Sequence, residues 1–220
     1  MKIETLYSII QILVRTLVRV EYINPQYVPL TGGCIIATNH LSHLDTPILF
    51  VSPGRRYVTA LAADKYKKHI LFRWILDTVR VVWIDRENAD FGAMRAAVEY
   101  LNKGVALGIA PEGTRSKGAL IEGKPGIALI ADKAKVPIVP VGIAGTEAIY
   151  KDWSHLRRPK ITVRFGAPFM LPPMDRDDRS GWLKCCTDEI MCRIAALLPP
   201  AYQGFYAQHP RLKELLSTLA

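Results

Sequence analysis

Apolar residues recur along this chain with two different spacings. In residues 3–18 they fall three or four positions apart, which predicts an amphipathic helix. Further on they form short, nearly continuous runs that predict buried strands, at 34–38, 55–63, 79–85, 105–111, 136–145 and 160–168. The intervening segments 67–77, 90–102, 126–135 and 178–197 have helical spacing, and a Pro-Pro pair and a basic tail follow the last of them.

The alternation of strands with helices indicates the fold class. Strands that are apolar on both faces are typical of a sheet covered by helices on both sides. We therefore expect one α/β domain with a mostly parallel or mixed sheet, preceded by an N-terminal amphipathic helix. The expected division is 1–22 for the N-terminal helix and 23–220 for the domain. In segment 90–102 we expect Phe91, Met94, Val98 and Leu101 to share one face.

The N-terminal helix has two interpretations. Polar residues such as Glu4, Gln11 and Arg15 interrupt its apolar run, whereas a spanning helix needs about 20 mostly apolar residues. No small-residue cleavage site follows, so a signal peptide is not expected. The helix either packs on the core or lies in a membrane interface, with Arg15 and Arg19 near lipid phosphates.

Charge indicates the kind of partner, and cysteine usage indicates the cellular compartment. Lys and Arg outnumber Asp and Glu by 29 to 20, giving a net charge of +9. The basic residues are dispersed rather than interleaved with aromatic residues, which favours an anionic membrane surface over nucleic acid. The cysteines at 34, 185, 186 and 192 have no CxxC spacing, so we expect a reduced cytosolic protein without a metal site.

The stretch TNHLSHLDTP, residues 38–47, contains a potential proton-transfer pair. On a continuous helix His40 and Asp45 would point about 140° apart. Thr46 precedes a proline and is expected outside the α region, so the loop can fold His40 back over a helix start capped by Asp45 or Thr46. Asp45 would then accept a hydrogen bond from one ring nitrogen of His40 and leave the other free to take a proton.

Two neighbours offer alternatives to this pair. His43 is a rival base because it also lies close to Asp45 in sequence. Ser42 lacks the surroundings of a nucleophile elbow, so we expect it to cap or hydrogen-bond the loop.

The stretch APEGTRSKG, residues 110–118, follows a buried strand. Gly113 permits a positive φ or a close backbone approach, and Arg115 offers a fork suited to phosphate. Arg86 after the run VVWID, and Lys124 after the PEGTRS turn, add further cations. The simpler interpretation is a surface turn with a local pair between Glu112 and Arg115.

Four segments in order, NHLSHLD, WIDR, PEGTRS and VPIVPVGIAG, resemble the motifs of the glycerolipid acyltransferases, of the 1-acyl-glycerol-3-phosphate acyltransferase type. The resemblance covers about residues 30–170, and ITVRFGAP resembles the strand that closes that domain. It implies a membrane-associated enzyme with an acyl thioester donor, either acyl-CoA or acyl carrier protein, and with no metal or other cofactor. It also implies that His40, not His43, is the base and that Asp45 is its partner.

The resemblance further implies a lysophospholipid acceptor, with 1-acyl-glycerol-3-phosphate giving phosphatidate. It allows either a peripheral or an integral membrane enzyme, and because the N-terminal helix is interrupted by polar residues we expect a peripheral location on the cytoplasmic face of the membrane. The implied acceptor-site residues are Arg86, Glu112, Gly113 and Arg115, and we add Thr114 and Lys124, on or just after the same turn, as further candidates. The chain departs from the family at Ala110, where Phe is usual, and at Ala62-Ala63, where Ala-Lys is usual. Alternatives are another lysophospholipid or glycolipid acceptor, a thioesterase in which His40 activates water, and a non-catalytic lipid-binding protein.

Overall fold

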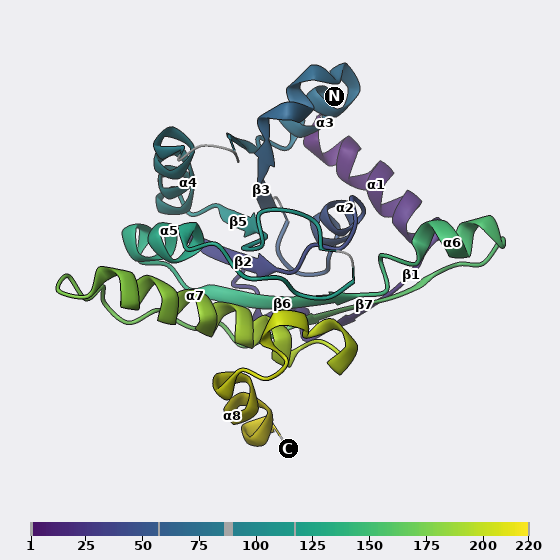
Figure 1. The fold of residues 1–220 in the computed structure, drawn as a ribbon. Coiled ribbons are helices and arrows are strands. Elements are labelled where there is room, and N and C mark those ends of the chain that lie inside the picture. Colours follow the sequence, from purple (N-terminus) through teal and green to yellow (C-terminus); the bar gives the residue numbers. More distant parts are fainter. Residues whose placement is uncertain (1, 57, 86–89, 117, 220) are drawn as a thin grey trace.

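The computed structural model describes residues 2–56, 58–85, 90–116 and 118–219 (Figure 1). Its seven-stranded sheet has the order β1-β7-β6-β2-β5-β3-β4. The strands are β1 (Arg19–Ile23), β2 (Cys34–Thr38), β3 (Val58–Ala63), β4 (Val82–Ile84), β5 (Ala106–Ile109), β6 (Ile138–Ala144) and β7 (Lys160–Phe165). The helices are α1 (Ile3–Leu17), α2 (Asp45–Phe50), α3 (Ile70–Thr78), α4 (Phe91–Asn102), α5 (Gly126–Ala134), α6 (Ile149–Ser154), α7 (Arg179–Ala196) and α8 (Pro210–Leu219).

Every neighbouring pair in the sheet is parallel except β6 with β7. The sheet is therefore mixed but mostly parallel, which confirms the expected α/β class. The carboxyl ends of β2, β3, β5 and β6 lie at one edge, where sites of α/β proteins are usually built. The loops that follow β2 and β5 carry the two motifs singled out in the sequence.

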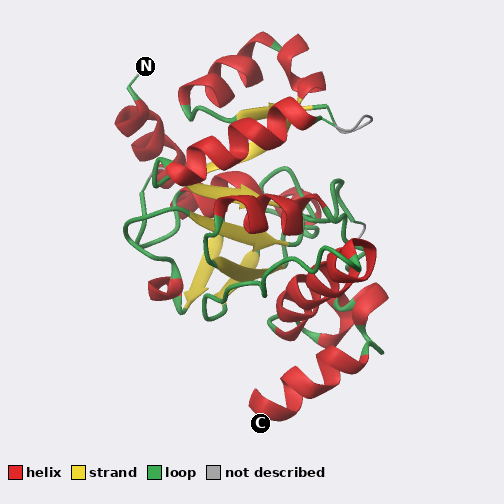
Figure 2. Ribbon diagram, turned by 90° about the vertical axis from the view of Figure 1, so that its left-hand side faces the viewer, coloured by secondary structure: helices red, strands yellow, loops and turns green. Residues whose placement is uncertain are grey.

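Helices cover both faces of the sheet, as Figure 2 shows. Alternate residues of β2 pack into the cores on the two faces of the sheet, because successive side chains of a strand point to opposite faces. Ile35 and Ala37 join a core with residues of α4, α5 and α7. Cys34 and Ile36 join a second core that includes Ile48 of α2 and residues beside it. The continuous apolar run 34–38 thus reflects burial on both sides.

Most predicted segments coincide with observed elements, with shifts at their ends. The helix expected at 67–77 is a 3₁₀ turn, Asp64–Lys68, followed by α3. The expected apolar face of α4 needs one correction, because Phe91 is 76% exposed. The side chains that α4 buries are Ala93, Ala97 and Leu101, since small residues let this helix approach its neighbours closely.

The N-terminal segment also differs from the expectation. The helix α1 ends at Leu17, and β1 then pairs with β7 in parallel register, Arg19 opposite Lys160. The expected division at 22/23 therefore falls inside a strand of the sheet. Arg158 donates hydrogen bonds to the carbonyl oxygens of Arg15 and Val18, which satisfies groups left unpaired at the helix end.

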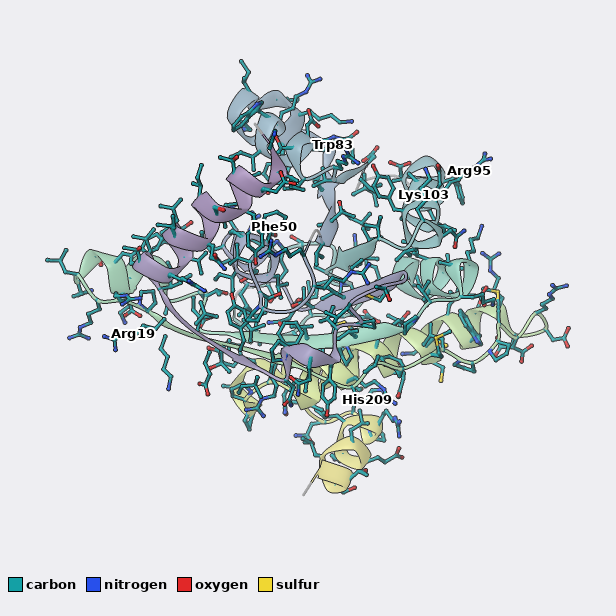
Figure 3. All side chains as sticks on the ribbon, turned by 180° about the vertical axis from the view of Figure 1, so that it is seen from behind. Arg19, Phe50, Trp83, Arg95, Lys103 and His209 are labelled. Atoms are coloured by element: carbon teal, nitrogen blue, oxygen red, sulfur yellow. The ribbon has the colours of Figure 1, made fainter. Side chains whose placement is uncertain are left out.

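The helix α1 has one face packed on the core and one exposed apolar face, the two features that the sequence interpretation gave as alternatives. Leu6 is buried, and the Tyr7 ring lies 5.7 Å from that of Phe50, which Figure 3 shows beneath α1. A second stripe is exposed and consists of Ile9, Ile12, Leu13 and Leu17. Among the described residues, no helix has the length and apolar content needed to cross a membrane.

Candidate active site

The loop after β2 brings His40 and Asp45 together as predicted. His40 Nδ1 lies 2.8 Å from Asp45 Oδ2. A carboxylate only accepts hydrogen bonds, so Nδ1 carries the hydrogen when the ring is neutral. The lone pair of the neutral ring is then on Nε2, which suits it to take a proton from a bound group. The His40 side chain is 15% exposed, so it is reachable from solvent.

Asp45 is the most densely bonded group of the site. Its Oδ2 also accepts hydrogen bonds from the backbone N–H groups of Leu41 and Ser42, at 2.7 and 2.8 Å. Its Oδ1 accepts one from the hydroxyl of Thr146 at 2.5 Å. The side chain is 2% exposed, and burying a carboxylate is costly unless donors replace its water. These four donors provide that replacement.

The local geometry corrects two details of the sequence interpretation. The helix α2 begins at Asp45 itself, and neither Asp45 nor Thr46 caps it, because Leu44 holds the cap position without a side-chain bond. Thr46 is helical although a proline follows it. The loop is folded back by the bonds that the Asp45 carboxylate accepts, not by the proline. Ser42 Oγ accepts a hydrogen bond from the Leu44 N–H at 3.3 Å, as expected for a loop-bonding serine.

Glu112 joins the PEGTRS turn to the histidine loop. Its side chain is 1% exposed, and its two carboxylate oxygens accept hydrogen bonds from the N–H groups of His40, at 2.9 Å, and Ile121, at 3.2 Å. Ser116 completes the link, since its N–H donates to the carbonyl of His40 at 2.8 Å. Burial raises the pKa of Glu112 above its usual range, although the backbone bonds oppose this shift. Glu112 therefore positions the backbone of His40.

Arg115 and His43 form a second cluster at the surface beside this pair. Arg115 donates to the hydroxyl of Tyr66 at 3.0 Å, and its NH1 lies 3.2 Å from His43 Nδ1. Because guanidinium has no acceptor, His43 Nδ1 accepts this bond as a neutral ring. Burial lowers the pKa of His43, and the cations Arg115 and Lys65 lower it further. The rival base therefore faces Arg115.

The remaining predicted residues lie on or near the same turn. Gly113 has a φ of +68°, as the sequence anticipated, and a Cβ there would lie 3.0 Å from side-chain carbons of Lys124. Lys124 thus crosses the glycine, and its backbone N–H donates to the carbonyl of Pro111. Thr114 is exposed on the turn. Arg86 lies outside the described residues, so its predicted place beside the acceptor stays a prediction.

Sequence reasoning missed Asn39, Ser116, Thr146 and Tyr66. The side-chain amide of Asn39 makes two hydrogen bonds with the backbone of Ile143, both at 2.8 Å, and so ties the end of β2 to β6. A signal was present, because Asn39 and Thr146 are polar residues that follow apolar strands. Their partners lie about a hundred residues away and have no mark in the sequence.

The four cysteines are free. Cys185 is exposed on α7, whereas Cys34, Cys186 and Cys192 are buried. Burial raises the pKa of Cys186 to about 11 and that of Cys192 to about 12. Thiols with such pKa values carry little thiolate at neutral pH and are poor nucleophiles. In the part of the chain that the structure describes, no cluster of His, Cys, Asp and Glu side chains is suited to hold a metal ion.

Comparison with known proteins identifies the family. A family model described as Acyltransferase matches residues 19–144, more than half of the 220-residue chain. The chain therefore belongs to this acyltransferase family, which confirms the resemblance seen in its motifs.

Two curated relatives show what the chain is similar to. A probable 1-acyl-sn-glycerol-3-phosphate acyltransferase of Mycoplasma pneumoniae is 33% identical over 66% of this chain and 56% of its own length. A 1-acyl-sn-glycerol-3-phosphate acyltransferase of Bacillus subtilis is 26% identical over 57% of this chain and 63% of its own length. The chain thus spans a little over half the length of these two curated relatives.

The crystal structure of a 1-acyl-sn-glycerophosphate (LPA) acyltransferase from Thermotoga maritima shares the fold, with a TM-score of 0.64 and 22% identity over 85% of this chain and 78% of that one.

Replacing Thr146 by Val should lower the free energy of unfolding by about 1.5–3 kcal/mol, because a buried bond to a charged group is lost. Thr146→Ser keeps the hydroxyl and should cost about 1 kcal/mol for the missing methyl group. Urea denaturation of both variants measures the difference. A larger loss in Ser than in Val would show that the methyl packing, not the bond to Asp45, is what Thr146 contributes.

Replacing Arg115 by Leu should raise the pKa of His43, because both a nearby cation and a donor to the neutral ring are removed. Titration of the histidine ring signals by NMR measures this shift, and His209, whose ring lies beside Asp188 of α7, is the internal control. A His43 pKa that stays the same or falls would contradict the observed contact with Arg115.

Proposed function

We propose that this chain transfers a fatty acyl group from an acyl thioester to the free hydroxyl of a lysophospholipid, namely 1-acyl-glycerol-3-phosphate, giving phosphatidate. The observation that carries this proposal is the pair of His40 and Asp45, fixed by Glu112 next to the turn that presents Arg115. The names of the relatives support the acceptor, since they describe acyltransferases acting on 1-acyl-sn-glycerol-3-phosphate.

The proposed reaction follows from the orientation of His40. Nε2 takes the proton of the acceptor hydroxyl as its oxygen attacks the thioester carbonyl. The new ester C–O bond forms, the C–S bond breaks, and the thiolate of CoA or acyl carrier protein leaves and is protonated. Asp45 stabilises the imidazolium that exists between these proton transfers. A thioester is already activated, so this chemistry needs no metal or organic cofactor.

Direct transfer of the acyl group to the acceptor is favoured, because the nearby serine and the buried cysteines are poor nucleophiles. Ser42 Oγ accepts a bond from the backbone, and the raised pKa values of Cys186 and Cys192 disfavour their thiolates. The backbone N–H groups of Leu41 and Ser42 already donate to Asp45, so they are not spare donors for an oxyanion. We therefore propose no acyl-enzyme intermediate.

Arg115 is the proposed contact for the acceptor phosphate. A phosphate monoester carries nearly two negative charges at neutral pH and offers three oxygens to a guanidinium fork. Lys65 and Lys124 bring further cations near Arg115. Lys65 lies against the ring of Tyr66, whose hydroxyl accepts from Arg115, and the Lys124 side chain passes over Gly113. Lys65 follows the Ala62-Ala63 pair by two residues, so it places a cation close to where the family has lysine.

The proposed location is the cytoplasmic face of a membrane, bound peripherally. The exposed stripe of α1, defined by Ile9, Ile12, Leu13 and Leu17, suits an interface, and a net charge of +9 suits anionic lipid. A thioesterase would use the same His40 with water in place of the acceptor. Product analysis with and without lysophosphatidate separates these reactions, because only a transferase needs the acceptor.

His40→Ala should lower the rate of phosphatidate formation by about 10²–10⁴-fold, the usual contribution of a general base. His43→Ala should lose less than about tenfold, because His43 has no contact with the reacting proton in this scheme. Mass spectrometry of the product and circular dichroism of both variants measure activity and folding. A dead His43→Ala with an active, folded His40→Ala would reverse the assignment.

Arg115→Ala should reduce kcat/KM for lysophosphatidate by roughly tenfold or more, because a hydrogen bond to a charged group is worth about 1.5–3 kcal/mol. Turnover of lysophosphatidylcholine, a bulkier phosphodiester with one phosphate charge, should change less. Competing both acceptors in one assay gives the ratio directly. If the intact enzyme uses both equally and the variant loses both alike, the phosphate-monoester assignment is wrong while acyl transfer stands.

Ile12→Glu should release the protein from anionic vesicles, because it places a charge in the exposed apolar stripe of α1. Gln11→Glu is the matched control, since it adds the same charge to the adjacent residue outside that stripe. Sedimentation with vesicles containing phosphatidylglycerol measures both variants. Equal binding by the two variants would show that the stripe does not contact lipid.

A further inference from the structure

The turn between α6 and β7 carries a leucine whose side chain is almost fully exposed to solvent. Leu156 is 98% exposed, and its φ is +55°. The other described non-glycine residues with positive φ are Asn24, Arg80 and Lys135, so Leu156 is the apolar one among them. Left-handed backbone is unfavourable for a residue with a Cβ, and full exposure of an apolar side chain gains nothing in the free protein.

The hydrogen bonds of this turn show which residue the backbone would prefer. The Leu156 N–H donates to the carbonyl of Trp153 at 3.0 Å, and the Arg157 N–H donates to that of Asp152 at 2.9 Å. This is the Schellman arrangement, and its left-handed position is the one that glycine usually fills. At the position of Leu156, glycine would therefore fit the left-handed backbone and would expose no apolar side chain to water.

The turn is fixed to the end of α1. Trp153 Nε1 donates to the carbonyl of Leu17 at 3.1 Å, and Arg158 donates to that of Val18 at 2.9 Å. Figure 1 shows α6 at the C-terminal end of α1, and Figure 3 shows Arg19 close to α6 from behind. These contacts hold Leu156 in a fixed position relative to the exposed stripe of α1, so it is not the tip of a free loop.

The chemistry around Leu156 matches an anionic bilayer surface. The segment 150–160 contains Lys151, Arg157, Arg158 and Lys160 against a single carboxylate, that of Asp152. Tyr150 is 60% exposed and makes an edge contact with the Trp153 ring at 6.0 Å. An apolar tip, aromatic rings and surrounding cations are the combination that membrane-interface segments use.

We propose that the α6–β7 turn is a second membrane-insertion point, in which Leu156 enters the acyl boundary of an anionic leaflet beside α1. The proposal rests on the peripheral membrane location given under the proposed function. It adds that the protein touches the bilayer at two points held rigidly together, so the bilayer also fixes the orientation of the domain. The conformational and solvent cost at Leu156 in the free protein is then offset when it is bound.

Leu156→Gly tests this because it separates membrane binding from stability. Glycine fits the left-handed position, so the melting temperature should stay the same or rise by a few degrees. Binding to vesicles of phosphatidylcholine with phosphatidylglycerol should weaken by roughly tenfold, the effect of losing about one buried leucine side chain. Leu30→Gly is the matched control, because Leu30 is 72% exposed in the loop before β2, at the opposite edge of the sheet from His40.

Unchanged vesicle binding by Leu156→Gly would overturn the proposal, as would a fall in melting temperature that accompanies the weaker binding. Loss of binding to the same extent in Leu30→Gly would also overturn it. Acyl transfer to a short-chain, monomeric lysophosphatidate is measured on the same proteins and should be unchanged in Leu156→Gly. Absence of that activity in the intact protein would refute acyl transfer alone, because the vesicle assay contains no substrate.

Discussion

The site depends on the burial of one carboxylate, that of Asp45. A charged group taken from water must recover its lost hydration from protein donors, and here these come from two loops of the chain. Leu41 and Ser42 donate from the loop after β2, His40 donates from the same loop, and Thr146 donates from the loop after β6. The need to satisfy Asp45 therefore shapes the loop and sets the ring of His40 at once.

A second buried carboxylate extends this arrangement to the next strand. Glu112 accepts from the His40 backbone, so the turn after β5 and the loop after β2 cannot move independently. The parallel pairing of β2 with β5 brings these two loops to the same edge of the sheet. In consequence the base is fixed by Asp45 through its ring and by Glu112 through its backbone, and Arg115 projects from the same turn. The proposed acyl transfer needs this proximity of base and phosphate contact.

The sequence predicted the features that depend on local pattern. The strand at 34–38 was predicted to the residue, because two-sided burial leaves a continuous apolar run, and the contact between His40 and Asp45 was predicted from its spacing. The expected cap of α2 by Asp45 or Thr46 was wrong, because Leu44 holds that position and the Asp45 carboxylate accepts its bonds from the loop instead. Thr146 was missed because its contact with Asp45 spans 101 residues. The strand β1 was assigned to the helix, because an edge strand of five residues has too little pattern of its own.

Asp45 holds the His40 ring with its hydrogen on Nδ1 and its lone pair on Nε2. Nitrogen-15 NMR of histidine-labelled protein, at a pH where His40 is neutral, measures this tautomer directly. We expect a protonated Nδ1 and an unprotonated Nε2 for His40 in the folded, active protein. A His40 ring protonated on Nε2 under those conditions would contradict it, because such a ring could not accept the proton of the acceptor hydroxyl at that nitrogen.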